Sequence, residues 1–294
     1  MLSAGRGKIA ICFTPRRGYV VSDSQNKSRA HQALQQASLA LRMQQFSQAE
    51  QLATEVLKSS RIDRNAVLIL AHALIAQNRA GEAVIPLERA VRRASDGEIE
   101  TLLGAALCSS GRSADGIQQL RRAAARHPPY LPAFQELAGQ LAKAGQLNEA
   151  VRTVEDGLSL VPESIELKVD LGRLFLQKFE CAKARKILMV ALDAAPGRPD
   201  ILTELALALF SNGEYAAAAD KFRHVLGLRP DDALARANLA RCLLEMGDRD
   251  GGEAALRSVM RGRPRLLGRA AYLVAASSHG RFFFRTSAAA KFLG

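Results

Sequence analysis

The sequence predicts an all-α solenoid, and three series of residues at a constant interval support this fold class. Two series of small residues and one of prolines recur every 34 residues. They are Gly104, Ala138, Gly172, Ala206 and Ala240; Gly116, Ala150, Ala184, Ala218 and Gly252; and Pro128, Pro162, Pro196, Pro230 and Pro264. A period of about 20–50 residues is typical of solenoids, in which each repeat packs on its neighbours.

The block 131–164 illustrates what one repeat contains. Apolar residues at helical spacing in each half predict two amphipathic helices. Gly145 lies between the halves, where a residue in the left-handed conformation can end a helix, and Pro162 closes the second half. Ala138 and Ala150 are small enough for the two helices to cross closely. A lone hairpin cannot bury its apolar face, so neighbouring blocks must stack.

This block resembles the tetratricopeptide repeat, which implies a right-handed superhelix with the first helix of each repeat on the concave side. Positions 8 and 20 are small throughout, and position 7 is leucine in all units except the first, which has Gln36. The resemblance covers seven units, 30–63, 64–96, 97–130, 131–164, 165–198, 199–232 and 233–266. In order, position 8 is Ala37, Ala71, Gly104, Ala138, Gly172, Ala206 and Ala240, and position 20 is Ala49, Ala83, Gly116, Ala150, Ala184, Ala218 and Gly252.

Two departures from the family pattern predict local effects. Pro86 falls inside the second helix of the second unit, where a proline is expected to kink the helix or reduce its stability. Phe179 replaces the turn glycine of the fifth unit.

The two ends carry the positive charge of this 294-residue chain, whose net charge is +12. Residues 1–29 have a net charge of +5, residues 257–294 have +8, and the repeats between them have −1. A continuous basic stripe for nucleic acid is therefore absent, and no nucleic-acid partner is expected. The segment 1–29 is expected to be disordered; a targeting segment, a translated extension and an arm that binds the groove are the open alternatives.

The C-terminal segment 267–294 is expected to hold a capping helix and a basic-aromatic tail. Residues 266–277 have the pattern of one further first helix, which would cover the last repeat. The run Phe282–Phe284 lies between two arginines. It either packs under the last repeat or forms a patch for a partner, and self-association through this end is possible.

Catalytic and cofactor motifs are lacking, so the chain is expected to be no enzyme and to bind no cofactor or metal. Its five histidines lie in different repeats without ligand spacing, and its four cysteines form no CxxC pair. No apolar run is long enough to predict a transmembrane helix, and a cytoplasmic location is expected.

The resemblance implies a partner-binding surface on the concave face, where positions 2, 5, 6, 9, 12 and 13 project. Acidic residues recur at position 6 and arginines at position 9, which predicts a partner with a basic segment. The alternative is a solvated face, since Asp170 and Arg173 are spaced to pair with each other. The predicted binding residues are Glu136, Asp170, Arg173, Glu204, Asn238 and Arg241.

The expected function is that of a non-catalytic scaffold or adaptor that binds a peptide or helical segment of a protein in this groove. The alternative is a structural subunit of a bacterial envelope, secretion or polysaccharide-export assembly. The three-repeat carboxylate clamp that grips chaperone tails in some family members has no counterpart in this sequence, so that role is not expected.

Overall fold

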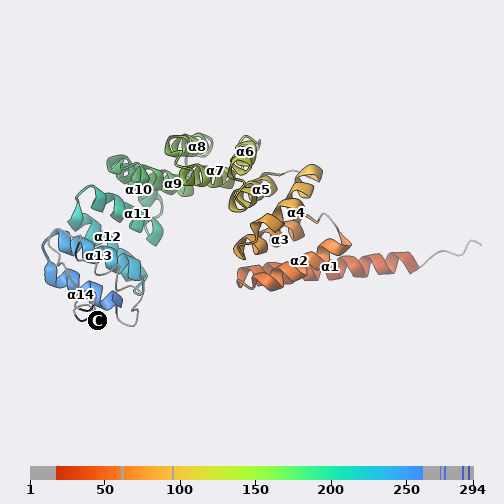
Figure 1. The fold of residues 1–294 in the computed structure, drawn as a ribbon, viewed down its shortest axis with the longest axis horizontal. Helices are drawn as coiled ribbons and strands as arrows, with labels where there is room; N and C mark the ends of the chain where they lie inside the picture. Colours follow the sequence, from red (N-terminus) through yellow and green to blue (C-terminus); the bar gives the residue numbers. More distant parts are fainter. Residues whose placement is uncertain are drawn as a thin grey trace, which may run out of the picture. The chain divides into compact units, whose positions relative to one another are not determined.

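A computed structural model describes residues 18–60, 63–94 and 96–260, together with the isolated residues 272, 275, 287 and 291. All fourteen elements in these ranges are α-helices, so the all-α expectation is confirmed (Figure 1). The chain forms two compact units, one up to Ala123 and one from Ala124, called here the N-terminal unit and the C-terminal unit.

Each predicted repeat contains a pair of helices. The N-terminal unit is built from α1 (Gly18–Arg42), α2 (Phe46–Ser59), α3 (Arg64–Ala76), α4 (Ala80–Arg93), α5 (Gly97–Ser109) and α6 (Ser113–Ala124). The C-terminal unit is built from α7 (Leu131–Lys143), α8 (Leu147–Leu160), α9 (Ile165–Gln177), α10 (Cys181–Ala194), α11 (Pro199–Ser211), α12 (Tyr215–Leu228), α13 (Ala233–Glu245) and α14 (Arg249–Met260).

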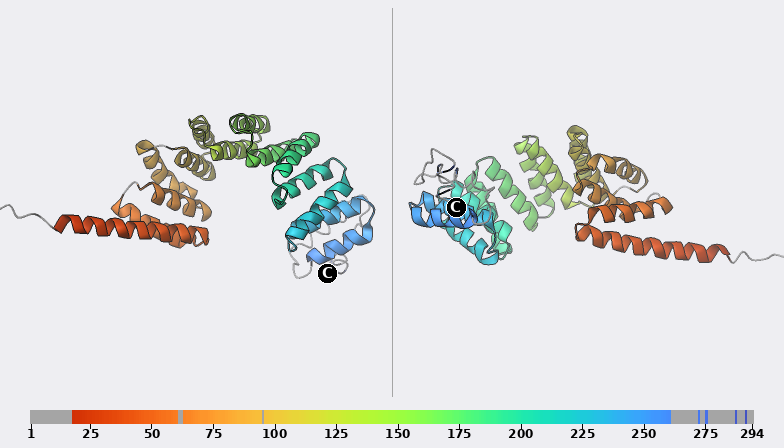
Figure 2. Two further views of the ribbon diagram at one scale, coloured as in Figure 1. Left: turned by 180° about the vertical axis from the view of Figure 1, so that it is seen from behind. Right: turned by 60° about the horizontal axis from the view of Figure 1, so that its bottom comes forward.

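First helices of neighbouring repeats contact one another in both units. In the N-terminal unit α3 contacts α1 and α5, and in the C-terminal unit α9 contacts α7 and α11. Figure 2 shows the helix pairs of successive repeats following one another along the chain. The helices α1, α3 and α5, and likewise α7, α9 and α11, therefore share a surface in their unit, called here its first-helix face.

Small residues at positions 8 and 20 allow the two helices of a repeat to cross closely, as predicted. A Cβ added to Gly116 would lie 2.3 Å from Cys108 Sγ and 2.7 Å from the carbonyl oxygen of Gly104. A Cβ on Gly172 would lie 2.6 Å from Leu188 Cγ. Where these positions hold alanine, the side chain is at most 2% exposed, so no larger residue would fit without displacing its neighbours.

The turn between the two helices of every repeat is a Schellman motif. In the fourth repeat the Gln146 N–H donates to the Leu141 carbonyl at 2.9 Å, and the Gly145 N–H donates to the Ala142 carbonyl at 3.0 Å. This pattern places position 15 in the left-handed conformation. All seven residues at this position have positive φ: Gln44, Asn78, Gly111, Gly145, Phe179, Gly213 and Gly247.

Phe179 is the least favourable residue among these seven. Its φ is +59° and its residue surface is 88% exposed. A bulky side chain in this region is disfavoured because its Cβ crowds the backbone. The motif imposes its geometry even on a side chain that gains nothing from burial.

Helix ends follow from local hydrogen bonding and from proline. Asp63, Asp96, Ser164 and Asp232 cap the first helices of four repeats by accepting from backbone N–H groups. Pro86 lies inside α4, which continues through it from Ala80 to Arg93. The proline thus does not end the helix, and a cost in stability stays a prediction.

The two terminal expectations stay predictions. A helix nevertheless begins inside the segment 1–29 that was expected to be disordered, because α1 starts at Gly18. No proline follows Pro15 in this stretch, so a helix nucleated by the packed part of α1 can extend through it. Residues 1–17, nearly all of the expected capping helix and Phe282–Phe284 lie outside the described residues.

No helix in the described part of the chain is both long enough and apolar enough to span a membrane.

Candidate functional site

Three of the predicted binding residues lie together on the first-helix face of the C-terminal unit. Gln135 Nε2 on α7 donates to Asp170 Oδ2 on α9 at 2.6 Å. Arg173, one turn further along α9, contacts Asp170 Oδ1 at 3.3 Å and donates through Nε to Glu204 Oε1 on α11 at 2.7 Å. These contacts form a polar chain across three successive repeats.

This polar chain leaves negative charge in excess. Partial burial lowers the pKa of Arg173, but the hydrogen bond to Glu204 and the charges of Glu204, Asp170 and Asp200 together outweigh this effect, so the pKa is raised. One guanidinium therefore serves two carboxylates, Asp170 and Glu204, whose side chains are 25% and 18% exposed. The self-pairing foreseen as the alternative is present, yet it does not neutralise the acidic residues.

The other three predicted residues have separate surroundings. Glu136 accepts from Gln140 Nε2 on its own helix at 2.8 Å. The Arg241 guanidinium lies 4.3 Å from the centroid of the Phe210 ring, which is within cation–π distance. Asn238 is only 8% exposed, so the expectation that it offers a groove contact does not fit its burial.

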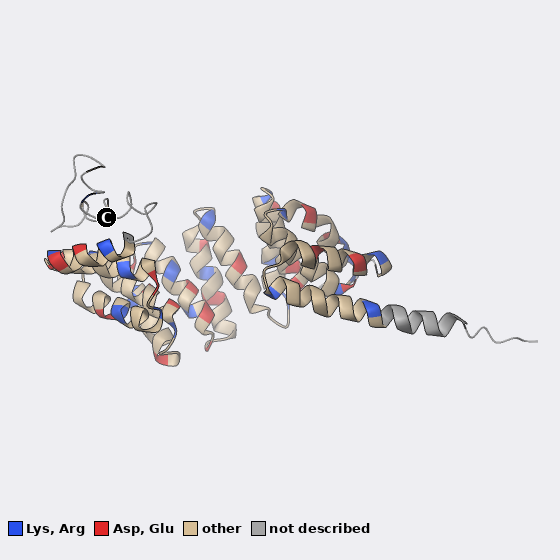
Figure 3. Ribbon diagram, turned by 90° about the horizontal axis from the view of Figure 1, so that it is seen from below, with Lys and Arg blue, Asp and Glu red and all other residues tan. Residues whose placement is uncertain are grey.

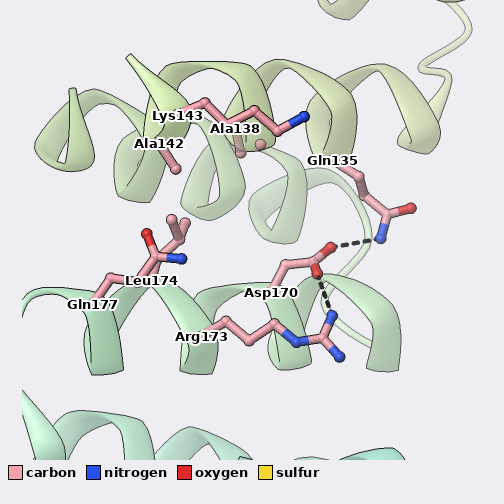
Figure 4. Close-up of a pocket in the computed structure, with 9 residues that line it drawn as sticks. Gln135, Ala138, Ala142, Lys143, Asp170, Arg173, Leu174 and Gln177 are labelled. Atoms are coloured by element: carbon pink, nitrogen blue, oxygen red, sulfur yellow. Dashed lines mark hydrogen bonds and ion pairs between the residues drawn. The ribbon is translucent and has the colours of Figure 1, made fainter. Parts of the chain in front are cut away.

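A groove of about 320 Å³ lies between α7 and α9 beside this polar chain, and it is called here the C-terminal groove (Figure 4). Its floor consists of small or aliphatic residues, and its rim is polar. The floor residues are Ala138, Gly139, Ala142 and Leu174, and the rim residues are Gln135, Lys143, Asp170, Arg173 and Gln177.

Two features of this groove leave it able to accept a ligand. A Cβ added to Gly139 would meet no atom within 4 Å, so the space above this residue is open. Among the described residues Lys143 has no acidic partner, and Figure 4 shows its side chain extended along the α7 side of the groove. The groove can therefore hold a small apolar group and offer both an ammonium and a carboxylate at its rim.

The N-terminal unit has a second groove, of about 400 Å³, on its own first-helix face. It is called here the N-terminal groove. Its lining comes from α1, α3 and α5: His31, Leu34, Gln35, Ser38, Arg64, Asn65, Leu68, Ile69, His72 and Glu98.

Charge in the N-terminal groove is confined to one edge. Arg64 donates through Nε to Asp96 at 2.5 Å and through Nη2 to Glu98 at 2.7 Å. These hydrogen bonds raise the pKa of Arg64. Loss of hydration lowers the pKa of His72 below its ordinary value, and the charge of Glu98 opposes this. His31 and Gln35 lie 3.1 Å apart through their side-chain nitrogens.

Sequence reasoning missed both grooves as cavities and missed most of their lining. Gln135 and Lys143 stand at positions 5 and 13, which the family pattern already directs to the concave face. Leu34, Leu68 and Ile69 stand at positions 5 and 6 of the first two repeats. The same rule applied to apolar residues would have indicated the N-terminal groove.

The described residues form neither a continuous stripe of charges of one sign nor a cluster of metal ligands. Figure 3 shows acidic and basic positions interspersed over the helices of both units. In the same ranges no three His, Cys, Asp or Glu side chains gather as metal ligands.

Comparison with known proteins agrees with these repeats. Family models of the tetratricopeptide repeat match residues 34–98 and 209–276. The human intraflagellar transport protein 88 homolog is 26% identical over 99 residues, which are 32% of this chain and span 12% of that protein.

Solved structures extend the likeness over most of the chain. PilF of Pseudomonas aeruginosa is 20% identical with a TM-score of 0.57, over 68% of this chain and 92% of its own. The human IFIT1 dimer with m7Gppp-AAAA is 15% identical with a TM-score of 0.64, over 84% of this chain and 63% of its own. At these identities the likeness is one of fold. Together with the family matches and the seven Schellman-linked helix pairs, it shows that the chain is a tetratricopeptide repeat protein.

Proposed function

We propose that the chain is a non-catalytic scaffold or adaptor, and that the C-terminal groove binds a peptide or helical segment of a protein partner. Tetratricopeptide repeats are in general a protein-interaction fold, and that is the starting point for the proposal. The observation that carries it is the C-terminal groove itself, with its open floor at Gly139 and its polar rim.

The floor determines which part of a partner can approach. Gly139, Ala138 and Ala142 have little or no side chain, so a partner side chain or backbone can come close to α7. Leu174 on α9 supplies an aliphatic wall opposite them. Burying an apolar side chain here would contribute roughly 1.5 kcal/mol or more to affinity before the costs of association.

The rim determines the charge that the partner should carry. Asp170 and Glu204 share Arg173, and among the described residues Glu136 has no cationic partner. A lysine or arginine of the partner would offset this excess negative charge, while a carboxylate could reach Lys143. Such pairs mainly set specificity and association rate.

Filling the groove tests the proposal directly. Gly139→Leu would occupy the open space with a side chain, and Gly227→Leu is a matched control because a Cβ on Gly227 of α12 also meets no atom within 4 Å. The measurement is affinity capture with cross-linking from a lysate, comparing the full-length wild type with both variants. A partner that cross-links near Lys143 and is retained by Gly227→Leu but lost by Gly139→Leu would support the proposal.

A partner that all three proteins capture equally would place binding outside this groove and contradict the proposal. A variant with Glu136→Gln, Asp170→Asn and Glu204→Gln then tests the expected basic segment, since a partner held by charge should be lost with these carboxylates.

The cytoplasmic location and the absence of catalysis are parts of this proposal. Cell fractionation tests the first. The alternative of a bacterial envelope, secretion or export subunit gains no support from a likeness to PilF at 20% identity, because that likeness concerns the fold. Self-association through residues 267–294 remains a prediction for sedimentation analysis.

A further inference from the structure

The N-terminal groove differs from the C-terminal groove in its floor, which consists of larger aliphatic side chains, and in the histidines that line it. We propose that it binds a protein segment presenting an apolar side chain beside a lysine or arginine, and that protonation of His72 weakens this binding. The inference rests on the proposed scaffold function, but it concerns a different groove and a different unit.

The floor of the N-terminal groove selects for an apolar side chain. Leu68 is 7% exposed and forms the base, while Leu34 on α1 and Ile69 on α3 are partly buried beside it. Three branched aliphatic side chains thus meet in a cavity of about 400 Å³. An aliphatic or aromatic side chain placed there would lose contact with water on several sides.

The charged edge of this groove selects for a cation next to that side chain. Arg64 is held by both Asp96 and Glu98, so one positive charge faces two negative ones. The Glu98 side chain remains 39% exposed and lines the groove. A lysine or arginine of the ligand can therefore pair with Glu98 without displacing Arg64, and an acidic ligand would face two carboxylates and one guanidinium.

His72 lies where its charge would oppose such a ligand. The charged and titratable groups that line the groove around it are His31 from α1, Arg64 from its own helix α3 and Glu98 from α5. The surrounding protein already disfavours the charged form of His72. A proton on His72 would add a cation close to Glu98 and so reduce the attraction for a basic side chain.

A random peptide library tests the inference because it samples apolar, basic and acidic side chains in every combination. Dodecapeptides displayed on phage are selected on the immobilised full-length chain at about pH 7.5 and released at about pH 5.5, a range in which histidine changes charge. Enriched peptides are then synthesised and their Kd is measured by fluorescence anisotropy. Three protein variants test the parts of the groove separately. Ile69→Asn changes its floor, Glu98→Gln removes the charge at its edge, and His72→Gln removes the side chain whose protonation is proposed to weaken binding.

Matched controls separate the groove from general effects on folding. Ile75→Asn changes an isoleucine of α3 that, like Ile69, is partly buried against the core of the N-terminal unit, but it does not line the groove. Glu88→Gln changes a carboxylate of α4 paired with Arg92. Circular dichroism verifies that each variant is folded. We expect Ile69→Asn and Glu98→Gln each to weaken binding about tenfold and both controls to bind like the wild type.

The outcomes distinguish this inference from the proposed function. Enriched peptides that combine an apolar residue with a neighbouring Lys or Arg, and whose pH dependence disappears in His72→Gln, support it. Enrichment of acidic peptides, or affinities that Ile69→Asn leaves unchanged, overturns it. If the selected peptides depend instead on Gly139, the proposed function stands and this inference fails, and if no peptide is enriched, this inference fails as well.

Discussion

The first-helix faces of the two units differ although their helices are held together in the same way. In the C-terminal unit this face carries a polar chain from Gln135 through Arg173 to Glu204. In the N-terminal unit the equivalent surface has an aliphatic floor at Leu68 and Ile69, with charge only at its edge. The buried small residues and the Schellman turns are common to both units.

This difference shows that packing and recognition depend on separate positions of the repeat. Positions 8, 15 and 20 are constrained because they determine how the two helices cross and turn. Positions 5 and 6 differ in kind between repeats, from Leu68 at position 5 of the second repeat to Asp170 at position 6 of the fifth. One framework can therefore present branched aliphatic side chains in the groove of one unit and a polar chain beside the groove of the other.

The largest expected effect comes from breaking the shared framework in one unit. Gly116→Val would force a side chain against Cys108 Sγ and the Gly104 carbonyl, so we expect a loss of roughly 2–4 kcal/mol in the free energy of unfolding. Urea denaturation measures the loss, and hydrogen exchange should locate it in α5 and α6. Gly81→Val is the control, because a Cβ there meets only Ser110 Cβ at 3.7 Å. Equal stability of the two variants would show that the crossing tolerates larger residues.

A smaller effect is expected from the polar chain that distinguishes the C-terminal unit. Arg173→Gln leaves Asp170 and Glu204 without their shared cation, and we expect a loss of about 1 kcal/mol because the arginine is partly exposed. Arg92→Gln, at a side chain 78% exposed, should change the urea midpoint very little. If Arg173→Gln also had no effect, the chain of hydrogen bonds would not stabilise the stacking of repeats.

The turns provide a comparison in which a substitution is expected to increase the stability of the protein. Phe179→Gly should stabilise the protein by roughly 0.5–1 kcal/mol, because glycine adopts positive φ without steric cost and the exposed ring loses little contact. Phe179→Ala should bring no such gain, since alanine keeps the Cβ. A lower thermal midpoint for Phe179→Gly than for the wild type would mean that the ring makes a stabilising contact.

The smallest effect should be a dependence of the N-terminal unit on pH. The folded state lowers the pKa of His72 from its ordinary value of 6.5, so the unfolded chain takes up the proton first as the pH falls. Stability from this group is complete above 6.5 and declines below that value until the folded-state pKa is passed. His72→Gln should therefore show a shallower loss of stability on acidification, measured by urea midpoints at several pH values. Parallel pH profiles would contradict this.

Much of the framework could be predicted from sequence because its constraints are periodic. The small residues at positions 8 and 20 predicted close crossings, and a Cβ on Gly116 or Gly172 would indeed collide with its neighbours. Asp170, Arg173 and Glu204 were grouped by the same periodicity, and the structure brings them into contact.

The remaining features depend on geometry that no spacing rule contains. The burial of Asn238 and the stacking of Arg241 on Phe210 arise from how α11 and α13 pack, so position alone could not separate them from exposed groove residues. The helical state of residues 18–29 likewise depends on propagation from a packed neighbour.

The Schellman turns make one position of each repeat suitable for spectroscopic labels. Because main-chain hydrogen bonds fix the turn, the side chain at position 15 contributes little to its geometry, and at Phe179 it points into solvent. Cysteines introduced at Gln44 and Asn78, where the turn already holds a side chain at positive φ, would carry a donor and an acceptor fluorophore on equivalent turns of the N-terminal unit. Such a pair would report on this unit when a ligand binds.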